Sequence, residues 1–457
     1  MKFNIFLTSI VVFFLFVFQV AAQQGNLQQI DSVIQKATKG FPAGLSILIA
    51  KNGRTVFEKG YGTASIELGV AMTPEMVFRI GSLSKQFTAV AVLRLMEEGK
   101  LSLSDPLSKY IPDYPLGDKI TIAHLLSHTS GIRELNEMKD FPIDANKTLR
   151  ADPLKLIEMF KHQPMSFAPG DKWSYCNSGY ILLGYIIEKE SGIPYEDYIT
   201  STFLRPLDMD HSWCGDQVQL IKNEVNGYKG GASGLEKEDY QLLNNVYSAG
   251  NIISTPSDLL KWNNAVFSGK LISKKSLELA TSPVTLNSGE KTYYGYGWFI
   301  KNVNGGTSIE HSGRISGFRA NALYMPQQDI FVVVLTNCSC FPLDGLTTEI
   351  AAIAIGKPYD KKPVVLAEKV LQEYNGVYVS PDGTNKLTVE TGSGGLTTLQ
   401  FNTGKKEPIW FYEKDNAYLK GGTPTYRFVR EKSTKITALK IYSRYGYEDW
   451  KRIGPVR

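Results

Sequence analysis

The residues with the plainest chemical potential are a serine and a lysine three positions apart, Ser82 and Lys85. On a helix this spacing places both side chains on one face, about one turn apart. A serine hydroxyl beside an amine can act as an acyl-transfer nucleophile, because the amine accepts its proton and unpaired N–H groups at a helix start stabilise the developing anion. A lone Ser-x-x-Lys pair is also typical of a capping serine followed by a surface lysine, so other residues must decide between these interpretations.

The residues after Lys85 predict the helix that would hold this pair. Apolar side chains recur between Phe87 and Leu95, and the run stops at Gly99. This pattern is typical of a buried helix with a glycine stop, with Ser82 in its first turn.

A second polar segment contains Tyr175 and Asn177, two positions apart and just before a predicted helix. A nearby ammonium favours the phenolate, so a tyrosine beside Lys85 would shed its proton more easily. The amide of Asn177 offers both a donor and an acceptor, which suits it to hold a substrate amide or the lysine.

A third segment, His311, Ser312 and Gly313, lies at the end of a predicted strand. Glycine there would let the backbone approach a substrate closely, because it has no side chain.

The order of the predicted elements indicates an α+β fold. Two strands joined by an Asn-Gly turn open the domain, helices fill its middle, and four strands and a helix close it. The antiparallel sheet would therefore be completed by both ends of the domain, with helices around it. The expected elements are the strands at 43–50 and 55–62, helices within 120–131 and 149–192 and at 256–267, strands at 296–301, 307–311, 320–325 and 330–336, and a helix at 346–354.

Taken in this order, the three polar segments resemble the three motifs of the serine β-lactamase and penicillin-binding protein family. The nearest branch is the class C type, with its β-lactamase-related esterases and D-amino-acid peptidases. The resemblance covers residues 29–356 and implies an antiparallel sheet flanked by helices, with an all-helical subdomain. It implies no cofactor and no metal.

The resemblance also implies roles for individual residues. Ser82 would be the nucleophile that forms an acyl-enzyme, and Lys85 and Tyr175 the pair that takes its proton and later helps water attack. Asn177 would orient Lys85 and a substrate amide. Which of Lys85 and Tyr175 is the base stays open.

The remaining roles fall on the third motif. His311, Ser312 and Gly313 would form the strand along which substrate lies, and the backbone N–H groups of Ser82 and Arg314 would form the oxyanion hole. Relatives often carry lysine where His311 stands, and that lysine favours β-lactams and other carboxylates. The histidine therefore favours a peptidase or an esterase over a class C-like β-lactamase, which stays as the alternative. Arg314 either supplies a cation to a substrate carboxylate or lies on the surface.

Several other residues have less specific signals. The segment 128–131 mimics the third motif but precedes the second, so we interpret it as scaffold. Glu134 comes too early to match the deacylating glutamate of class A enzymes, which disfavours that class. His124 and His128 are four apart, but no third ligand is evident, so zinc is not expected. Tyr294 and Trp298 either line the cleft or pack in the core, and Cys176 is expected to pack rather than react.

The ends of the chain have their own character. Met1-Lys2, an apolar stretch to Phe18 and small residues up to Ala22 are typical of a secretory signal peptide cleaved after Ala22. An uncleaved membrane anchor is the alternative.

The C-terminal part of the chain changes in character. Residues 357–369 are rich in Pro and Lys, and from Glu373 short alternating runs predict a small all-β module. We therefore divide the chain into a signal peptide (1–22), a β-lactamase-like domain (23–357), a linker (358–370) and a C-terminal all-β domain that resembles lipocalins (371–457).

Composition limits the partners and the compartment. The formal charge of +5 over 457 residues, without a basic run, makes nucleic acid an unexpected partner. Four cysteines in an exported protein allow one or two disulfides. We predict a periplasmic or secreted serine hydrolase that acts on small esters or D-amino-acid amides, including peptidoglycan-derived peptides. A non-catalytic envelope sensor or scaffold is the rival, and the oligomeric state cannot be predicted.

Overall fold

The structure is a computed structural model that describes residues 24–135, 152–215, 220–231, 234–239, 241–359, 363–381, 383–392, 395, 397–401, 404, 406–419, 425–431, 435–443 and 446–455. The predicted signal peptide at 1–22 lies outside these residues. The described residues fall into two compact units, one within 1–300 and 307–356, the other within 301–306 and 357–457.

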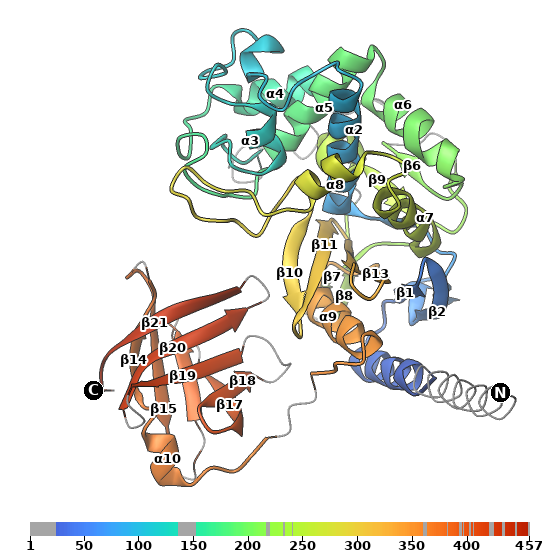
Figure 1. Cartoon of the computed structure of the whole chain (residues 1–457). Helices are drawn as coiled ribbons and strands as arrows, with labels where there is room; N and C mark the ends of the chain where they lie inside the picture. Colours follow the sequence, from blue (N-terminus) through green and yellow to red (C-terminus); the bar gives the residue numbers. More distant parts are fainter. Residues whose placement is uncertain are drawn as a thin grey trace, which may run out of the picture. The chain divides into compact units, whose positions relative to one another are not determined.

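The first unit is built on a six-stranded antiparallel sheet whose strands come from both ends of the unit (Figure 1). Both ends of the unit complete the sheet, as the sequence predicted, and the structure shows that the N-terminal hairpin pairs with the last strand, Leu45 opposite Thr336. In spatial order the strands are β10 (Phe299–Val303), β11 (Gly306–Ile315), β12 (Phe318–Met325), β13 (Ile330–Thr336), β1 (Leu45–Lys51) and β2 (Arg54–Tyr61).

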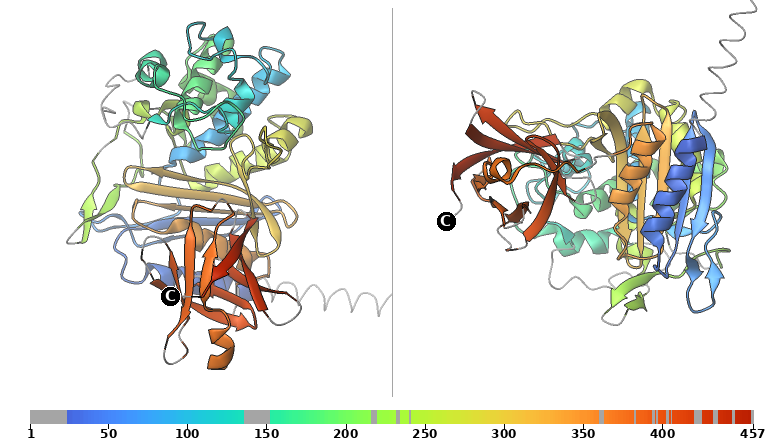
Figure 2. Two further views of the ribbon diagram at one scale, coloured as in Figure 1. Left: turned by 90° about the vertical axis from the view of Figure 1, so that its left-hand side faces the viewer. Right: turned by 90° about the horizontal axis from the view of Figure 1, so that it is seen from below.

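Both faces of this sheet are covered, which explains why β13 is apolar from Ile330 to Leu335. Phe331, Val333 and Leu335 point into the core that the helices on one side share. On the opposite face the helix over residues 24–38 and α9 (Leu343–Ala354) lie side by side (Figure 2). A strand buried on both sides has no polar alternation, and the β-branched run fits that environment.

Helices form the rest of the unit. The apolar core that joins them to the sheet runs through α2 and α5, which are buried on nearly all sides. The helices are α2 (Lys85–Glu97), α3 (Ile122–Leu126), α4 (Pro153–Lys161), α5 (Asn177–Ser191), α6 (Tyr195–Ile199), α7 (Pro256–Phe267) and α8 (Lys274–Ala280). Short sheets pair β3 (Thr63–Ser65) with β4 (Val70–Ala71), β5 (Phe78–Arg79) and β6 (Trp213–Cys214) with β9 (Ile252–Ser254), and β7 (Tyr228–Gly231) with β8 (Gly234–Lys237).

The second unit is a closed antiparallel barrel of eight strands around its own apolar core. Its strands are β14 (Gly376–Val379), β15 (Lys386–Thr391), β16 (Thr397–Phe401), β17 (Lys406–Glu413), β18 (Asn416–Leu419), β19 (Thr425–Glu431), β20 (Lys435–Ser443) and β21 (Gly446–Gly454). The fold class, an α+β domain with a small all-β domain after it, is confirmed.

Details of the prediction need correction in the second unit. β18 and β21 were not predicted from the sequence, because polar residues and glycine interrupt their alternation. The start of the short helix α10 (Glu368–Gln372) was expected to be linker, but Leu371 of this helix packs into the barrel core. Within the described part of the chain, no helix is both long enough and apolar enough to cross a membrane.

The four cysteines give one disulfide, between Cys338 and Cys340. Cys176 and Cys214 form no disulfide and are buried in the core of the first unit. Cys176 Sγ donates to the Ile132 carbonyl oxygen, so the cysteine inside the second motif packs away from solvent.

Candidate active site

Ser82 lies on a tight turn between β5 and α2. The turn is a 3₁₀ helix, Gly81–Ser84, and the α-helix begins only at Lys85. The prediction that Ser82 occupies the first turn of the α-helix is therefore wrong, although serine and lysine still share one face. Gly81 has a φ of 52°, and a Cβ there would lie 2.9 Å from the backbone oxygen of Arg314. Because β11 passes this close, residue 81 must be glycine, and the backbone forms a 3₁₀ turn here instead of an α-helical one.

Lys85 is fully buried, and its amine has three polar neighbours. Nζ lies 3.3 Å from Ser82 Oγ, 2.7 Å from Asn177 Oδ1 and 2.8 Å from the Ala249 carbonyl oxygen. Burial lowers the pKa of Lys85 to about 7. A neutral amine has two N–H groups, which the two carbonyl-type oxygens accept, so its lone pair is left for the Ser82 hydroxyl.

Asn177 begins α5, and Glu134 fixes its orientation. Asn177 Nδ2 donates to Glu134 Oε1 at 2.7 Å, and the backbone N–H of Asn177 donates to Oε2 of the same carboxylate. Since the amide nitrogen faces the carboxylate, its oxygen must face Lys85. A carboxylate at a helix N-terminus also interacts favourably with the helix dipole. From the sequence, Glu134 was only a poor match to the glutamate of class A enzymes, and its contact with Asn177 was not predicted.

Tyr175 presents a hydroxyl that makes no hydrogen bond of normal geometry with any residue of the described ranges. Its ring lies 4.8 Å from Lys85 Nζ, and the neighbouring Ser82 hydroxyl favours its ionised form. Burial nevertheless raises the pKa of Tyr175 well above its ordinary value. The expectation that a lysine neighbour makes this phenol more acidic is therefore wrong, because the cost of burying a phenolate outweighs the groups that favour it.

His128 supports the second motif from behind. Its Nδ1 accepts from the backbone N–H of Cys176 at 3.0 Å, and its ring centroid lies 4.4 Å from that of Tyr175. Burial and the nearby Lys85 lower the pKa of His128 well below its ordinary value, so the ring is neutral. Residues 128–131 were predicted to be scaffold, and His128 supports the second motif through these contacts. His124 Nδ1 accepts from the N–H of Thr121 in the cap of α3.

His311 lies within β11, which continues beyond the predicted strand to Ile315. Both ring nitrogens of His311 are engaged: Nδ1 lies 2.6 Å from the Ser312 carbonyl oxygen and Nε2 lies 3.0 Å from the Tyr294 hydroxyl. Tyr294 is fully buried behind His311, and Trp298 packs in the core.

Gly313 lets β11 pass beside the nucleophile. A Cβ on Gly313 would overlap the Ile80 carbonyl oxygen and lie 3.2 Å from Ser82 N. The backbone around Gly313 and Arg314 is therefore close to the Ser82 N–H, where the sequence analysis expected an oxyanion hole.

A cavity of about 270 Å³ opens over these groups. Sequence reasoning did not find four of its residues: Trp173, Phe299, Arg319 and Asp344. A signal for Arg319 was present, because Ser316-Gly317 forms the turn of a hairpin whose register pairs residue 319 with Arg314. The lining residues are Ser82, Trp173, Tyr175, Phe299, His311, Ser312, Gly313, Arg314, Arg319 and Asp344.

Comparisons with known proteins agree with this geometry. The family described as Beta-lactamase matches residues 30–354. Penicillin-binding protein 4* of Bacillus subtilis is 29% identical over 364 residues, which cover 74% of this chain and 80% of that protein. The solved structure of the octameric penicillin-binding protein homologue from Pyrococcus abyssi has a TM-score of 0.67 and 29% identity, and the match covers 93% of this chain and 100% of that one.

A second solved structure, D-amino acid amidase from Ochrobactrum anthropi SV3 complexed with L-phenylalanine amide, has a TM-score of 0.66. It is 22% identical, and the match covers 73% of this chain and 99% of that one. At this identity the likeness shows a shared fold.

Proposed function

Because this chain belongs to the beta-lactamase family and is a serine hydrolase of that family, we propose that it hydrolyses amides of D-amino acids through an acyl-enzyme on Ser82. The observation that carries the proposal is the buried amine of Lys85, 3.3 Å from Ser82 Oγ and with a pKa of about 7. A base with a pKa near the working pH is the most effective one for general base catalysis. The fold shared with D-amino acid amidase and the third motif with His311 support an amide substrate over a β-lactam.

In acylation Lys85 accepts the proton of Ser82 as Oγ attacks the substrate carbonyl carbon. The carbonyl oxygen becomes an oxyanion between the backbone N–H groups of Ser82 and Arg314. Removal of one such donor typically costs a factor of about 100 to 1,000 in rate, so this contact is a major contribution.

Tyr175 then serves as the acid. Its raised pKa keeps the phenol protonated at neutral pH, and its hydroxyl is free of other partners among the described residues. It gives its proton to the leaving amine as the C–N bond breaks, and the proton held by Lys85 replaces it. In deacylation, water attacks the acyl-enzyme by the same proton transfers in reverse order, and Ser82 Oγ regains its proton as the ester bond breaks.

The test compares D- and L-phenylalanine amide as substrates of the wild type, Ser82→Ala and Ser104→Ala, an exposed serine on a loop. We expect hydrolysis of the D-amide by the wild type and by Ser104→Ala, and loss of at least about a factor of 1,000 in Ser82→Ala. Turnover that survives in Ser82→Ala, or preference for the L-amide, contradicts the proposal. Labelling of wild type but not Ser82→Ala by a fluorophosphonate separates a hydrolase from a non-catalytic sensor.

We further propose that the protein is exported, on the signal-like sequence at 1–22. Fractionation of expressing cells and sequencing of the mature N-terminus provide the test. A periplasmic or secreted protein beginning at Gln23 is expected; an intact N-terminus in the cytoplasm excludes export.

A further inference from the structure

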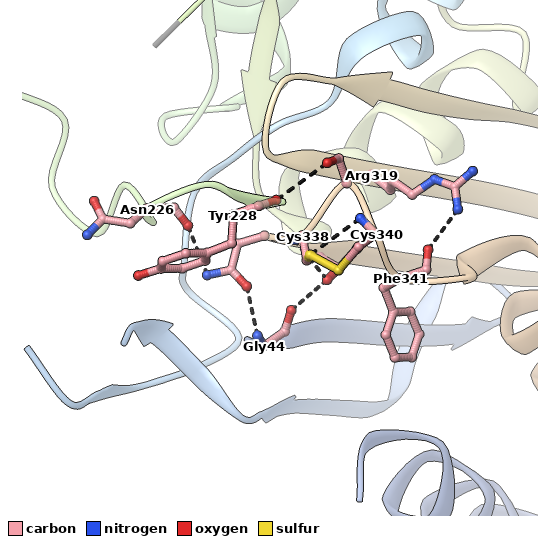
Figure 3. Close-up of a disulfide and its surroundings, with 10 residues drawn as sticks. Gly44, Asn226, Tyr228, Arg319, Cys338, Cys340 and Phe341 are labelled. Carbon is pink, nitrogen blue, oxygen red and sulfur yellow. Dashed lines mark hydrogen bonds between the residues drawn. A yellow bond between two sulfur atoms is a disulfide. The ribbon is translucent and has the colours of Figure 1, made fainter. Parts of the chain in front are cut away.

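The disulfide between Cys338 and Cys340 closes a very short ring directly after β13, since the two cysteines are only two positions apart (Figure 3). A disulfide stabilises a fold mainly by constraining the unfolded chain, and this contribution is smallest for the shortest loops. So short a ring is a weak staple for the fold as a whole, and its effect is to be sought in the residues next to it.

The two cysteines of the ring differ in accessibility. Cys338 is fully buried, whereas Cys340 is exposed. Thiol–disulfide exchange begins when a thiolate attacks a sulfur that it can reach, so the Cys340 side is the side of attack. The sulfur that leaves is then Cys338 Sγ, and the backbone N–H of Cys340 already donates to it at 3.3 Å. Because a hydrogen bond to the charged form stabilises a thiolate, this contact favours the departure of Cys338 Sγ.

One side of the ring is anchored to β7. The backbone N–H of Tyr228 donates to the Asn337 carbonyl oxygen at 2.9 Å, and the N–H of Ser339 donates to the Tyr228 carbonyl oxygen at 3.0 Å. The side-chain oxygen of Asn337 also accepts from the backbone N–H of Gly44 at 2.7 Å. These bonds hold the start of the ring in place, so the disulfide ties Cys340 to a fixed corner of the sheet.

The other side of the ring leads to the wall of the active-site cavity. Phe341 follows directly on Cys340, and its carbonyl oxygen accepts from Arg319 Nη1 at 2.8 Å (Figure 3). Arg319 lines the cavity that contains Ser82, and so does Asp344, three residues beyond Phe341. Opening the ring would release Cys340 from its corner and, with it, the carbonyl group that orients Arg319.

We propose that the Cys338–Cys340 disulfide is a site of thiol exchange with a dithiol reductant, and that its redox state sets the cavity wall through Phe341 and Arg319. One thiolate of the dithiol attacks Cys340 Sγ and forms a mixed disulfide, while Cys338 Sγ leaves with the bonding electron pair. The second thiolate of the reductant then displaces Cys340 Sγ. The reductant ends as a disulfide and both cysteines end as thiols, which take up the two protons that the dithiol gives up.

The first measurement tests the exchange in the native protein. The wild type is incubated with dithiothreitol and alkylated with iodoacetamide, and the modified peptides are mapped by mass spectrometry. We expect alkylation of Cys340 after reduction and not before, whereas Cys176 and Cys214 stay unmodified because both are buried. The Tm should fall only slightly, since the ring is short. An unmodified Cys340 overturns the inference, and so does modification of Cys176 and Cys214 together with a large loss of Tm, which would mark a structural disulfide.

The second measurement compares the KM for D-phenylalanine amide of oxidised and reduced protein, after removal of the dithiol under nitrogen; here the inference rests on the proposed function. Reduction should raise KM by roughly two- to tenfold, the effect of one hydrogen bond, because Arg319 loses its fixed direction. Cys338→Ala combined with Cys340→Ala should have the KM of the reduced wild type and should not respond to the dithiol. The matched control is Cys214→Ser, which keeps a donor toward Asn251 Oδ1 and should respond like the wild type.

The outcomes separate failure of the inference from failure of the proposed function. An equal KM for oxidised and reduced wild type overturns the inference and leaves the hydrolase intact. A response that persists undiminished in Arg319→Gln overturns the route through Phe341. Absence of Ser82-dependent cleavage of D-phenylalanine amide and of p-nitrophenyl acetate overturns the proposed function and, with it, the effect on the cavity, whereas the alkylation of Cys340 still decides whether the disulfide exchanges.

Discussion

The pH dependence of acylation gives a test of the assigned base that can be worked out from the structure. If neutral Lys85 takes the proton, the rate of acylation rises with pH and reaches its half-maximum near the pKa of about 7. A tyrosinate base would place the midpoint far higher, because burial raises the pKa of Tyr175. The assay is the rate of fluorophosphonate labelling, or the burst with a p-nitrophenyl ester, between pH 5 and 10.

Glu134→Gln provides the perturbation. Two hydrogen bonds of 2.7 Å, through the amide of Asn177, connect Lys85 Nζ to the Glu134 carboxylate. The lysine amine and the carboxylate are thus roughly 7 Å apart, and a charge pair at this distance has an attraction of about 2.4 kcal/mol at an effective dielectric constant of about 20, or about 1.7 pKa units. The negative charge of Glu134 raises the pKa of Lys85, so its removal should move the midpoint lower by about one to two units.

A matched control removes a distant negative charge. Glu158→Gln, on the surface of α4, should leave the midpoint where it is. A midpoint near 9 or above in the wild type, or an upward shift in Glu134→Gln, would refute the assignment of Lys85 as base. Since Gln can accept only one of the two bonds to Asn177, a thermal melt of the variant accompanies the kinetics.

The remaining predictions concern the groups around the nucleophile. Gly313→Ala should abolish activity and lower the Tm, because its Cβ would overlap a backbone carbonyl of the nucleophile's turn; activity and a melt measure both. Between pH 7 and 10.5 the wild type should gain stability relative to Lys85→Met, by up to roughly 4 kcal/mol, because the unfolded lysine keeps a proton that the folded amine has lost; urea titrations at pH 6.5 and 9.5 measure the difference. His128→Phe should lower kcat by roughly tenfold, since the second motif loses a buried acceptor, whereas His124→Phe should not.

The sequence predicted the parts of the site that depend on residue type and order. Ser82, Lys85, Tyr175 and Asn177 lie together as the three-motif pattern required. The sheet followed from apolar, β-branched runs, since a strand buried on both faces tolerates few polar residues.

The sequence did not predict what depends on the folded environment. The low pKa of Lys85 and the high pKa of Tyr175 both come from burial, which no local pattern reports. The role of Glu134 required knowing that residues 134 and 177 meet. The engaged ring of His311 required the position of Tyr294 behind it. Motif spacing alone therefore could not decide whether Lys85 or Tyr175 is the base.

Mass spectrometry of the intact protein, quenched with acid during turnover of N-acetyl-D-alanyl-D-alanine, tests the central claim most directly. The account predicts that the protein gains the mass of one N-acetyl-D-alanyl group, that the adduct maps to the peptide containing Ser82, and that Ser82→Ala never carries it. An adduct on another residue, or turnover by Ser82→Ala at the wild-type rate, would contradict the account.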